Sequence, residues 1–489
     1  MQNGLQRSLC LMCACLFSLL MSADNEKNTW PDLPLLQIET VGGEMPQNNI
    51  VYPPEGCVGI STKNRYVNGR MVMTLRGDTL YDSGKYVSGT SGMRIKIRGN
   101  STGANLPQHP YKLKLSQKAD LLMRADSRFQ HKDWVLLSIC TWNPAFTNNQ
   151  TNISTWLGNM VSHAVGMHWT PATELVNVVL NGEYQGFYTL TESVADGTGR
   201  LDVDKTGFIV EHDAYYWNED GIYFKSDYQH DLFGWTYKYP DADEVMPEQQ
   251  ENISSYINLL ETKLYAGEEV DDYIDYPSFA KWVLAHDILG AYDAGGTNRF
   301  LCKRDYLLEN PKASRLEMCA LWDFDSSFRQ ETNKYSVIHE TDYFYYPALF
   351  RLPRFRDTYL ALYDSLVNNN FYEQICAELS FFEQRYSVAF EESAALHRTI
   401  FPGECGNPMS VQVAEMKNKL SERWTALAKN VEALRETIDG VGQMQRVDEA
   451  VPIYDVNGRC FAPEALPKLP PGVYIQRDAW GRTRKFYQK

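Results

Sequence analysis

The hydrophobic period changes along the chain, and this change limits the fold class more than any other feature. Apolar and polar residues alternate in short segments of the N-terminal third, namely residues 71–75, 93–97 and 111–115. Alternation of this kind is typical of strands with one buried face. After Tyr276, and most clearly over residues 413–438, apolar residues recur every three or four positions, as on one helix face. The sequence therefore predicts an α+β fold that is β-rich at the N-terminus and helical toward the C-terminus.

Two turns predict antiparallel strand pairs. Asn181-Gly182 separates two apolar runs, and this dipeptide supplies the positive φ angles of a tight hairpin turn. Further along, residues 300–307 and 315–321 flank a turn at Asn310-Pro311. Cys302 and Cys319 are placed symmetrically about that turn. We expect the two cysteines to face each other, either as a disulfide or as two packed thiols.

The first 23 residues have the pattern of a signal peptide. Arg7 precedes an apolar stretch over residues 9–21, and the small residues Ser22 and Ala23 follow. The pattern predicts an exported protein that is periplasmic, exposed on the cell surface or extracellular. It leaves open whether Cys15 carries a lipid anchor.

The composition of the remaining chain predicts how it divides into segments and which kinds of partner it binds. We expect a β-rich segment over residues 24–90, a main domain over residues 91–440, and a C-terminal tail over residues 441–489. Lys and Arg number 47 against 62 Asp and Glu, which gives a net charge of −15. This charge opposes attraction to nucleic acid, so no nucleic-acid partner is expected. Beyond the N-terminus, no apolar run has the roughly 18 residues that a transmembrane helix needs.

A loop of small residues is the first candidate binding element. It contains Arg98, Gly99, Asn100 and Ser101, and it lies between two predicted strands. Small residues allow backbone N–H groups to approach a phosphate closely. The loop also fits the G-x-S-x-G pattern of hydrolases, but that pattern requires a following helix, and a strand is predicted here. A phosphate-binding loop and an ordinary surface loop both remain open.

Three charged residues on predicted strands are further candidates. Lys112 and Lys114 share one face of the strand that follows the loop. They would neutralise phosphate oxygens as point charges, or they would simply face the solvent. Glu192 ends another apolar run and is either an inward carboxylate or a charge at a strand end.

Asp323 and Asp325 interrupt an apolar segment and form the strongest candidate site. On a strand their Cα atoms would lie about 6 to 7 Å apart on one face. Buried like charges at that spacing are costly unless a cation lies between them. The two carboxylates have two interpretations: they bind a metal ion or act as acid and base, or they form a structural salt bridge. Asp293 and Asn298 precede the predicted hairpin in the order of base and metal ligand found in kinases, although a helix-capping turn explains them equally well.

Taken together, these segments resemble the CotH kinase family. The resemblance covers about residues 90–440 and implies a divergent, two-lobed protein-kinase-like fold. The segments that carry it are Arg98-Gly99-Asn100-Ser101, Tyr111-Lys112-Leu113-Lys114-Leu115, Lys132-Asp133-Trp134-Val135-Leu136-Leu137, residues 181–192, Tyr237-Lys238-Tyr239-Pro240-Asp241, Asp293 with Asn298, and Trp322-Asp323-Phe324-Asp325.

The resemblance implies a secreted kinase that transfers phosphate from ATP to a protein acceptor, such as a surface or coat protein, with Mg²⁺ or Mn²⁺. It implies that Arg98, Gly99, Asn100, Ser101, Lys112 and Lys114 hold the nucleotide, that Glu192 closes the hinge side, that Asp293 is the catalytic acid or base, and that Asn298, Asp323 and Asp325 hold metal. The chain departs from the family pattern at residues 141–149. Two other functions stay open: a non-catalytic surface protein on the same fold, and a glycoside hydrolase that uses Asp323 and Asp325.

Overall fold

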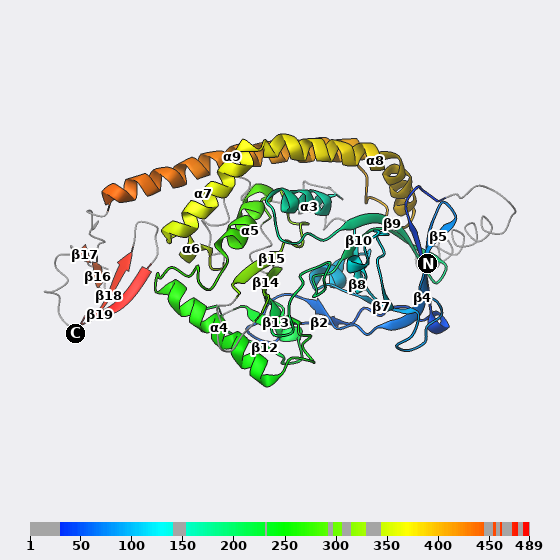
Figure 1. Ribbon diagram of the computed structural model, residues 1–489, viewed down its shortest axis with the longest axis horizontal. Coiled ribbons are helices and arrows are strands. Elements are labelled where there is room, and N and C mark those ends of the chain that lie inside the picture. Colours follow the sequence, from blue (N-terminus) through cyan, green and yellow to red (C-terminus); the bar gives the residue numbers. More distant parts are fainter. Residues whose placement is uncertain are drawn as a thin grey trace, which may run out of the picture. The chain divides into compact units, whose positions relative to one another are not determined.

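The computed structural model describes residues 30–139, 153–229, 232–291, 297–305, 314–328 and 344–444, together with four strands between residues 453 and 488 (Figure 1). The expected signal peptide, the departure from the family pattern over residues 141–149 and Asp293 lie outside the described residues. The chain divides into two compact units, residues 1–427 and residues 428–489. No helix in the described ranges is both long and apolar enough to cross a membrane.

The first unit contains a closed seven-stranded barrel. Its strands pair in the order β1 (Leu35–Thr40), β9 (Thr173–Leu180), β10 (Glu183–Glu192), β8 (His131–Ser138), β7 (Tyr111–Ala119), β6 (Met93–Ile97) and β4 (Val67–Leu75). Strand β4 then pairs with β1, which closes the ring. Strands β1 and β9 are parallel, the other neighbours are antiparallel, and β5 (Asp78–Asp82) adds to β4.

The barrel shows that the expected two-lobed protein-kinase-like fold is wrong. Closure requires β1 and β4, which come from the chain before residue 90. Strand β4 pairs with β1 over residues 69–74 and with β6 over residues 67–69, so it joins both ends of what would otherwise be an open sheet. Sequence alternation shows which face of a strand is buried, but it does not show which strands become neighbours.

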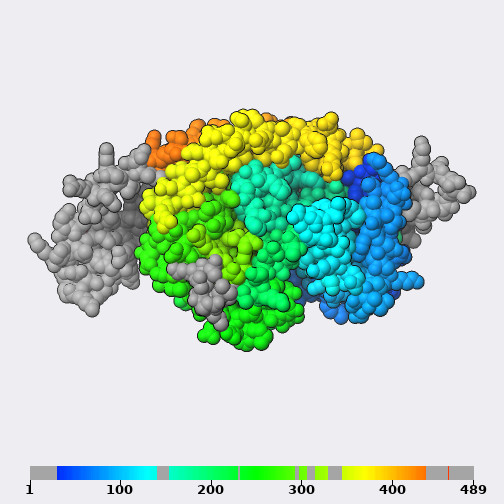
Figure 2. Space-filling model, in the orientation of Figure 1, coloured from blue at the N-terminus to red at the C-terminus, as the bar shows by residue number. Residues whose placement is uncertain are grey.

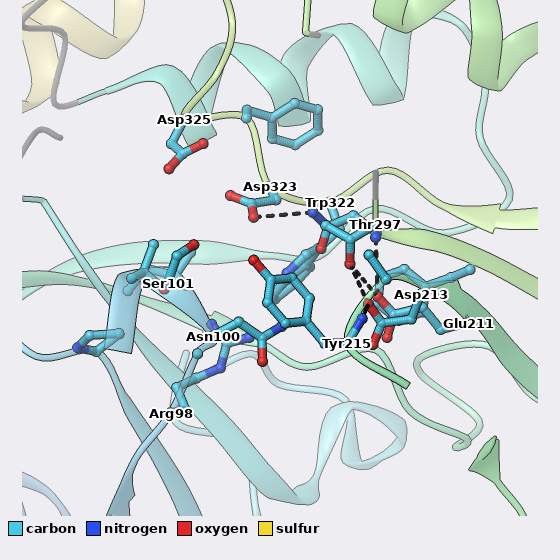
Figure 3. Close-up of a pocket in the computed structure, with 18 of the residues that line it drawn as sticks. Arg98, Asn100, Ser101, Glu211, Asp213, Tyr215, Thr297, Trp322, Asp323 and Asp325 are labelled. Atoms are coloured by element: carbon cyan, nitrogen blue, oxygen red, sulfur yellow. Dashed lines mark hydrogen bonds between the residues drawn. The ribbon is translucent and has the colours of Figure 1, made fainter. Parts of the chain in front are cut away.

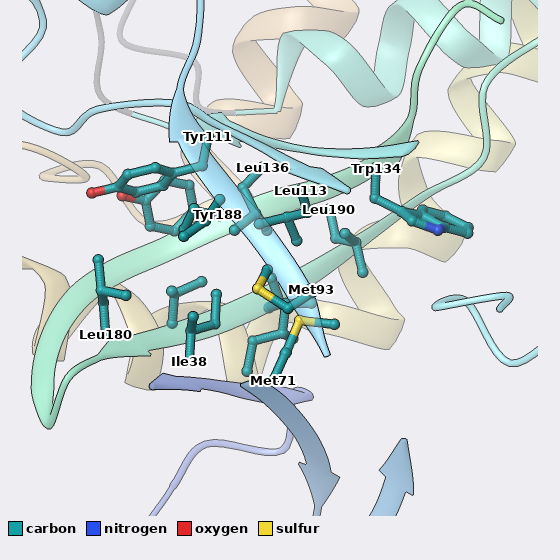
Figure 4. Close-up of a cluster of buried hydrophobic side chains, with 14 of the residues drawn as sticks. Ile38, Met71, Met93, Tyr111, Leu113, Trp134, Leu136, Leu180, Tyr188 and Leu190 are labelled. Carbon is teal, nitrogen blue, oxygen red and sulfur yellow. The ribbon is translucent and has the colours of Figure 1, made fainter. Parts of the chain in front are cut away.

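Alternate residues of each strand fill the barrel interior (Figure 4). On β6 and β7 the inward residues include Met93, Ile95, Leu113 and Leu115, all at most 1% exposed. Burying one such side chain stabilises the fold by about 1.5–3 kcal/mol. The residues between them, among them Lys112, are therefore on the outer face of the barrel.

A second, five-stranded antiparallel sheet lies in the same unit. Its order is β12 (Tyr223–Phe224), β13 (Gly234–Tyr239), β11 (Phe208–Asp213), β14 (Arg299–Lys303) and β15 (Leu316–Ala320). The pairing of β14 with β15 confirms the predicted hairpin. Cys302 and Cys319 are buried there in one core cluster as free thiols, so they form no disulfide.

Helices cover these sheets. They are α3 (Ser154–Ala164), α4 (Pro247–Tyr265), α5 (Tyr276–Leu289), α6 (Tyr346–Leu349), α7 (Pro353–Asn368), α8 (Phe371–Ile400) and α9 (Met409–Met444). The α7–α8 segment is yellow in Figure 2; α8 packs against β10 and α3, and α7 packs against α5. Phe390 of α8 packs edge-on against Phe187 of β10 at 5.3 Å between ring centroids. Short elements complete this unit: η1 (Val41–Gly43), β2 (Ile50–Val51), β3 (Ser61–Thr62), α2 (Ser101–Asn105), η2 (Ser127–Phe129) and η3 (Tyr216–Asn218).

Helix α5 is the central helix, because it is buried on all sides. Asp275 caps its N-terminus by accepting a hydrogen bond from Ser278 N, and Gly290 ends it in the left-handed conformation. Helix α9 begins in the first unit and confirms the predicted apolar stripe, since Val413, Met416 and Leu420 are at most 1% exposed. The second unit contains a four-stranded antiparallel sheet in the order β17 (Cys460–Phe461), β16 (Ile453–Asp455), β18 (Gly472–Arg477) and β19 (Thr483–Gln488).

Candidate functional site

A polar pocket of about 580 Å³ lies where the barrel meets the five-stranded sheet. Figure 3 shows Asp323 and Asp325 on one side of it and Arg98, Asn100 and Ser101 on the other, with the ring of Tyr215 between them. Its charged lining residues are Arg98, Glu211, Asp213, Glu219, Lys238, Asp323 and Asp325. The pocket therefore combines two cations with five carboxyl groups.

The barrel side of the pocket is the small-residue loop after β6. Gly99 has φ of +95°, and a Cβ added there would lie 2.4 Å from Thr102 Oγ1, so glycine is required. Ser61 Oγ donates to Asn100 Oδ1 at 2.6 Å, which anchors the loop to β3. The loop leads into the short helix α2, whereas the sequence predicted a direct return to a strand. Arg98, Gly99, Asn100 and Ser101 all line the pocket.

Arg98 faces carboxylates across the pocket. Burial lowers the pKa of its guanidinium, while the negative charges of Asp323 and Glu211 act in the opposite direction. The backbone N–H of Arg98 donates to Pro110 O at 2.9 Å, which continues the pairing of β6 with the segment that becomes β7. The guanidinium is thus held by the barrel and directed toward the opposite sheet.

Asn298 and Asp323 meet on the other side. The Asn298 Nδ2 amide donates a hydrogen bond to Asp323 Oδ2 at 3.2 Å. Both residues have left-handed backbones, with φ of 63° for Asn298 and 65° for Asp323. Asp323 lies just beyond β15 rather than on a strand as expected, because a positive φ interrupts strand geometry. Asp325, two residues on, is exposed at the pocket surface.

A third group of residues was not assigned a role from the sequence. Glu211 and Asp213 lie on β11, which is buried throughout. Lys238 Nζ lies 3.0 Å from Glu211 Oε2, and the backbone N–H of Asn298 donates to Glu211 Oε1 at 3.1 Å. Thr297 Oγ1 donates to Asp213 Oδ1 at 2.9 Å. These contacts fix the turn that carries Asn298 against the centre of the sheet.

The buried charges of this group shift one another's pKa. Burial, followed by the charge of Glu211, raises the pKa of Asp213 to about 7. Burial alone would lower the pKa of Lys238, but the carboxylates of Glu211, Glu219 and Asp213 raise it above its usual range. Lys238 is therefore a permanent cation beside a carboxyl group that titrates near neutrality. Two acidic residues spaced by two, with His212 between them, directly after the apolar run of residues 208–210 are the sequence signal that would have revealed this group.

The other predicted site residues lie elsewhere. Lys112 and Lys114 are on the outer barrel face and are not among the residues that line the pocket, and Lys112 Nζ lies 3.4 Å from Asp133 Oδ1. Glu192 is 1% exposed and accepts hydrogen bonds from Arg124 Nη2 at 2.7 Å and from Ala172 N at 3.0 Å. Glu192 thus ties the end of β10 to its neighbours.

Oxygen ligands for a metal ion are present in the pocket. Asp323 and Asp325 supply carboxylates, and Asn298 supplies an amide next to Asp323. Among the described residues no three His, Cys, Asp or Glu side chains are arranged to hold a metal ion by themselves. This donor set suits Mg²⁺, which commonly takes one or two carboxylates and completes its shell with substrate phosphates and water.

Comparison with known families decides the assignment. The family model described as CotH kinase protein matches residues 95–380, more than half of the chain. The chain belongs to the CotH kinase family. The comparison with curated proteins finds no match. Every charged residue of the pocket lies within the CotH match, whereas β1 and β4, which close the barrel, precede it.

Proposed function

We propose that this CotH-family chain is a metal-dependent phosphotransferase that moves the terminal phosphate of ATP to a hydroxyl group of an exported protein. Family membership supports phosphoryl transfer. The observation that carries the proposal is the pocket itself, which combines the cations Arg98 and Lys238 with the oxygen ligands Asn298 and Asp323. Phosphoryl transfer requires both kinds of group around one phosphate chain.

The pocket's own charge favours a nucleotide that brings divalent cations with it. Five acidic side chains and two basic ones line it, so a bare triphosphate would meet net repulsion. Mg²⁺ or Mn²⁺ held by Asp323, Asp325 and Asn298 would neutralise phosphate oxygens. Arg98 would hold phosphate oxygens from the barrel side and Lys238 from the sheet side.

The role of Glu211 follows from its contacts. Glu211 orients Lys238 and the Asn298 turn through its two oxygens, so it acts as a positioning residue. Asp293 stays the predicted catalytic acid or base of the acceptor hydroxyl. The predicted signal peptide supports an acceptor outside the cytoplasm, such as a surface or coat protein.

The first experiment is a thermal-shift measurement on residues 24–489 with ATP and Mg²⁺ or Mn²⁺. We expect ATP to raise Tm only when the metal is present. Asp323→Ala should abolish this rise, and it should lower the Tm of the unliganded protein only modestly, because Ala meets the cost of the left-handed backbone at this position. Asp78→Ala, at an exposed carboxylate on β5, is the matched control and should behave as the parent.

Transfer itself is tested by incubating the protein with ATP labelled at the γ-phosphate and exported proteins from the source cell. A parent protein that neither gains stability from metal and ATP nor labels any acceptor would refute the proposal. An Asp323→Ala variant that binds metal and ATP like the parent would refute the assignment of this site.

A further inference from the structure

Four basic residues occupy neighbouring positions on the outer face of β6 and β7. The strand register places Arg94 opposite Lys114 and Lys96 opposite Lys112. Their neighbours Ile95 and Leu113 are 0% exposed and fill the barrel, so these four side chains point out of it. We call Arg94, Lys96, Lys112 and Lys114 the basic strip.

The basic strip concentrates like charge. Side chains directly opposite each other on antiparallel strands have Cβ atoms about 5 Å apart, and like charges there are destabilising. Arg94 and Lys96 both lie over the ring of Tyr66, at 5.0 Å and 4.9 Å from its centroid. Burial, followed by the charge of Lys112, lowers the pKa of Lys96. Within the described ranges, the ion pair found for the strip is that of Lys112 with Asp133. Asp133 also lies opposite Lys114 in the pairing of β7 with β8, and the charge of Glu219 acts to raise the pKa of Lys96, so two carboxylates offset part of the repulsion. An anionic partner would relieve what remains.

The strip leads directly into the pocket. Arg98 is the next residue on the same face after Arg94 and Lys96, and it lines the pocket. At about 3.3 Å per residue, the distance along the strand from Arg94 to Arg98 is about 13 Å. This length matches about four residues of an extended chain.

We propose that the basic strip binds an acidic segment of the protein acceptor and delivers the adjoining hydroxyl group to the pocket at its Arg98 end. This inference rests on the proposed phosphotransfer. Acidic residues of the acceptor should then fall within about four positions of the accepting residue.

The charge of the whole chain makes the strip distinctive. At −15 the protein as a whole repels acidic partners, so an acidic segment would gain attraction only at a local positive surface. The same net charge disfavours a nucleic-acid partner, because its row of phosphates would extend beyond the strip and meet the negative charge of the rest of the protein. The carboxylates that are proposed to hold a metal ion beside the nucleotide line the pocket and are not part of the basic strip.

The test measures peptide binding by fluorescence anisotropy. The probe is a fluorescein-labelled peptide of twelve residues with one Ser flanked by six Glu, and the reference peptide has Gln at those six positions. Lys112→Gln combined with Lys114→Gln should weaken binding of the Glu peptide about tenfold, since each exposed pair contributes up to about 1 kcal/mol. Lys85→Gln combined with Lys205→Gln removes the same charge at exposed sites elsewhere and should bind as the parent. Added salt should reduce the difference between the two double variants.

Three outcomes would overturn the inference. The first is equal binding of the Glu peptide by the two double variants. The second is loss of metal-dependent ATP stabilisation in the Lys112/Lys114 variant, which would assign the strip to the nucleotide phosphates. The third is an oligonucleotide of equal charge that binds the strip more tightly than the Glu peptide.

The outcome for the strip is separable from that for the pocket. A parent protein that binds the Glu peptide through the strip but gains nothing from ATP and metal would support the docking surface while refuting phosphotransfer. Arg94→Gln provides a second variant on the other strand, and it should weaken binding of the Glu peptide if the four cations act together. Unliganded Tm values of all variants establish that they are folded.

Discussion

The side-chain amide of Asn298 donates a 3.2 Å hydrogen bond to Asp323 Oδ2, although 25 positions separate the two residues in the chain. Both residues have positive φ angles, at the two ends of the β14–β15 hairpin. Left-handed backbone is uncommon in residues other than glycine and is found preferentially at functional sites. The hairpin therefore determines both the separation and the backbone geometry of the two proposed metal ligands.

Two substitutions at Asn298 separate backbone strain from the lost amide. Asn298→Gly and Asn298→Ala both remove the hydrogen bond to Asp323, but only Ala meets the cost of a left-handed backbone. We expect Asn298→Ala to be less stable than Asn298→Gly by about 1 kcal/mol, measured by urea denaturation. Both should reduce metal-dependent ATP stabilisation. Equal stability of the two variants would show that the backbone at this position relaxes.

Gly158 of α3 positions the Asp323 segment through Phe324. A Cβ added at Gly158 would lie 2.2 Å from Phe324 Cγ. Replacing a helical glycine by Ala ordinarily raises stability by up to about 1 kcal/mol. Here Gly158→Ala should instead lower the free energy of unfolding by about 1–3 kcal/mol, because Phe324 must move.

A double-mutant cycle provides the control for that substitution. With Phe324 already changed to Ala, adding Gly158→Ala should be neutral or stabilising. Additive effects of the two changes in thermal or urea unfolding would contradict a direct clash.

Asp213 should make stability fall as the pH rises. Its pKa is raised to about 7, from 3.8, by burial and by Glu211. Between these values the folded protein holds a proton that the unfolded chain has lost, so the unfolding free energy contributed by Asp213 decreases with rising pH. Relative to the parent, Asp213→Asn should become progressively more stable from pH 4 to pH 7 and level off above it. Urea denaturation at unit pH steps measures this, and a difference that is constant with pH would contradict it.

Lys238 should matter more to stability than an exposed lysine in an ion pair. Lys238→Met leaves the carboxylate of Glu211, which is 8% exposed, without its cation. We expect a loss of about 2 kcal/mol in unfolding free energy. Lys263→Met breaks the more exposed pair with Glu268 and should cost less than about 1 kcal/mol. Adding Glu211→Gln to Lys238→Met should recover much of the loss, and failure to do so would argue against the buried pair as the cause.

Local patterns in the sequence predicted the parts of the fold that depend on near neighbours. The Asn181-Gly182 turn joins β9 and β10 as expected, and the hairpin prediction placed Asn298 beside Asp323. Barrel closure depends instead on β1 pairing with β9, across about 140 positions. No residue type marks such a partner, so the closed barrel could not be read from the sequence.

The same limit applies to the site. Residues 98–101 and Asp323 line the same pocket, and a local sequence pattern marked each of them as a candidate site. Glu211 becomes part of it only because β11 lies between β13 and β14, which bring Lys238 and Asn298 to it. Alternation placed Lys112 and Lys114 correctly on one strand face, but it contained no information on which positions along that face border the pocket, which Arg98 lines and the two lysines do not.

The pairing of β4 with β1 has a consequence for how the chain can be shortened and how it folds. A fragment limited to the family match would begin within β6 and would expose two unpaired strand edges, on β6 and on β9. Such edges promote aggregation. During synthesis β1 is made early, but its parallel partner is complete only when residue 180 has been added. The ring also needs β10, which joins β9 to β8 and ends at residue 192, so any nascent chain shorter than this length must wait with an open sheet.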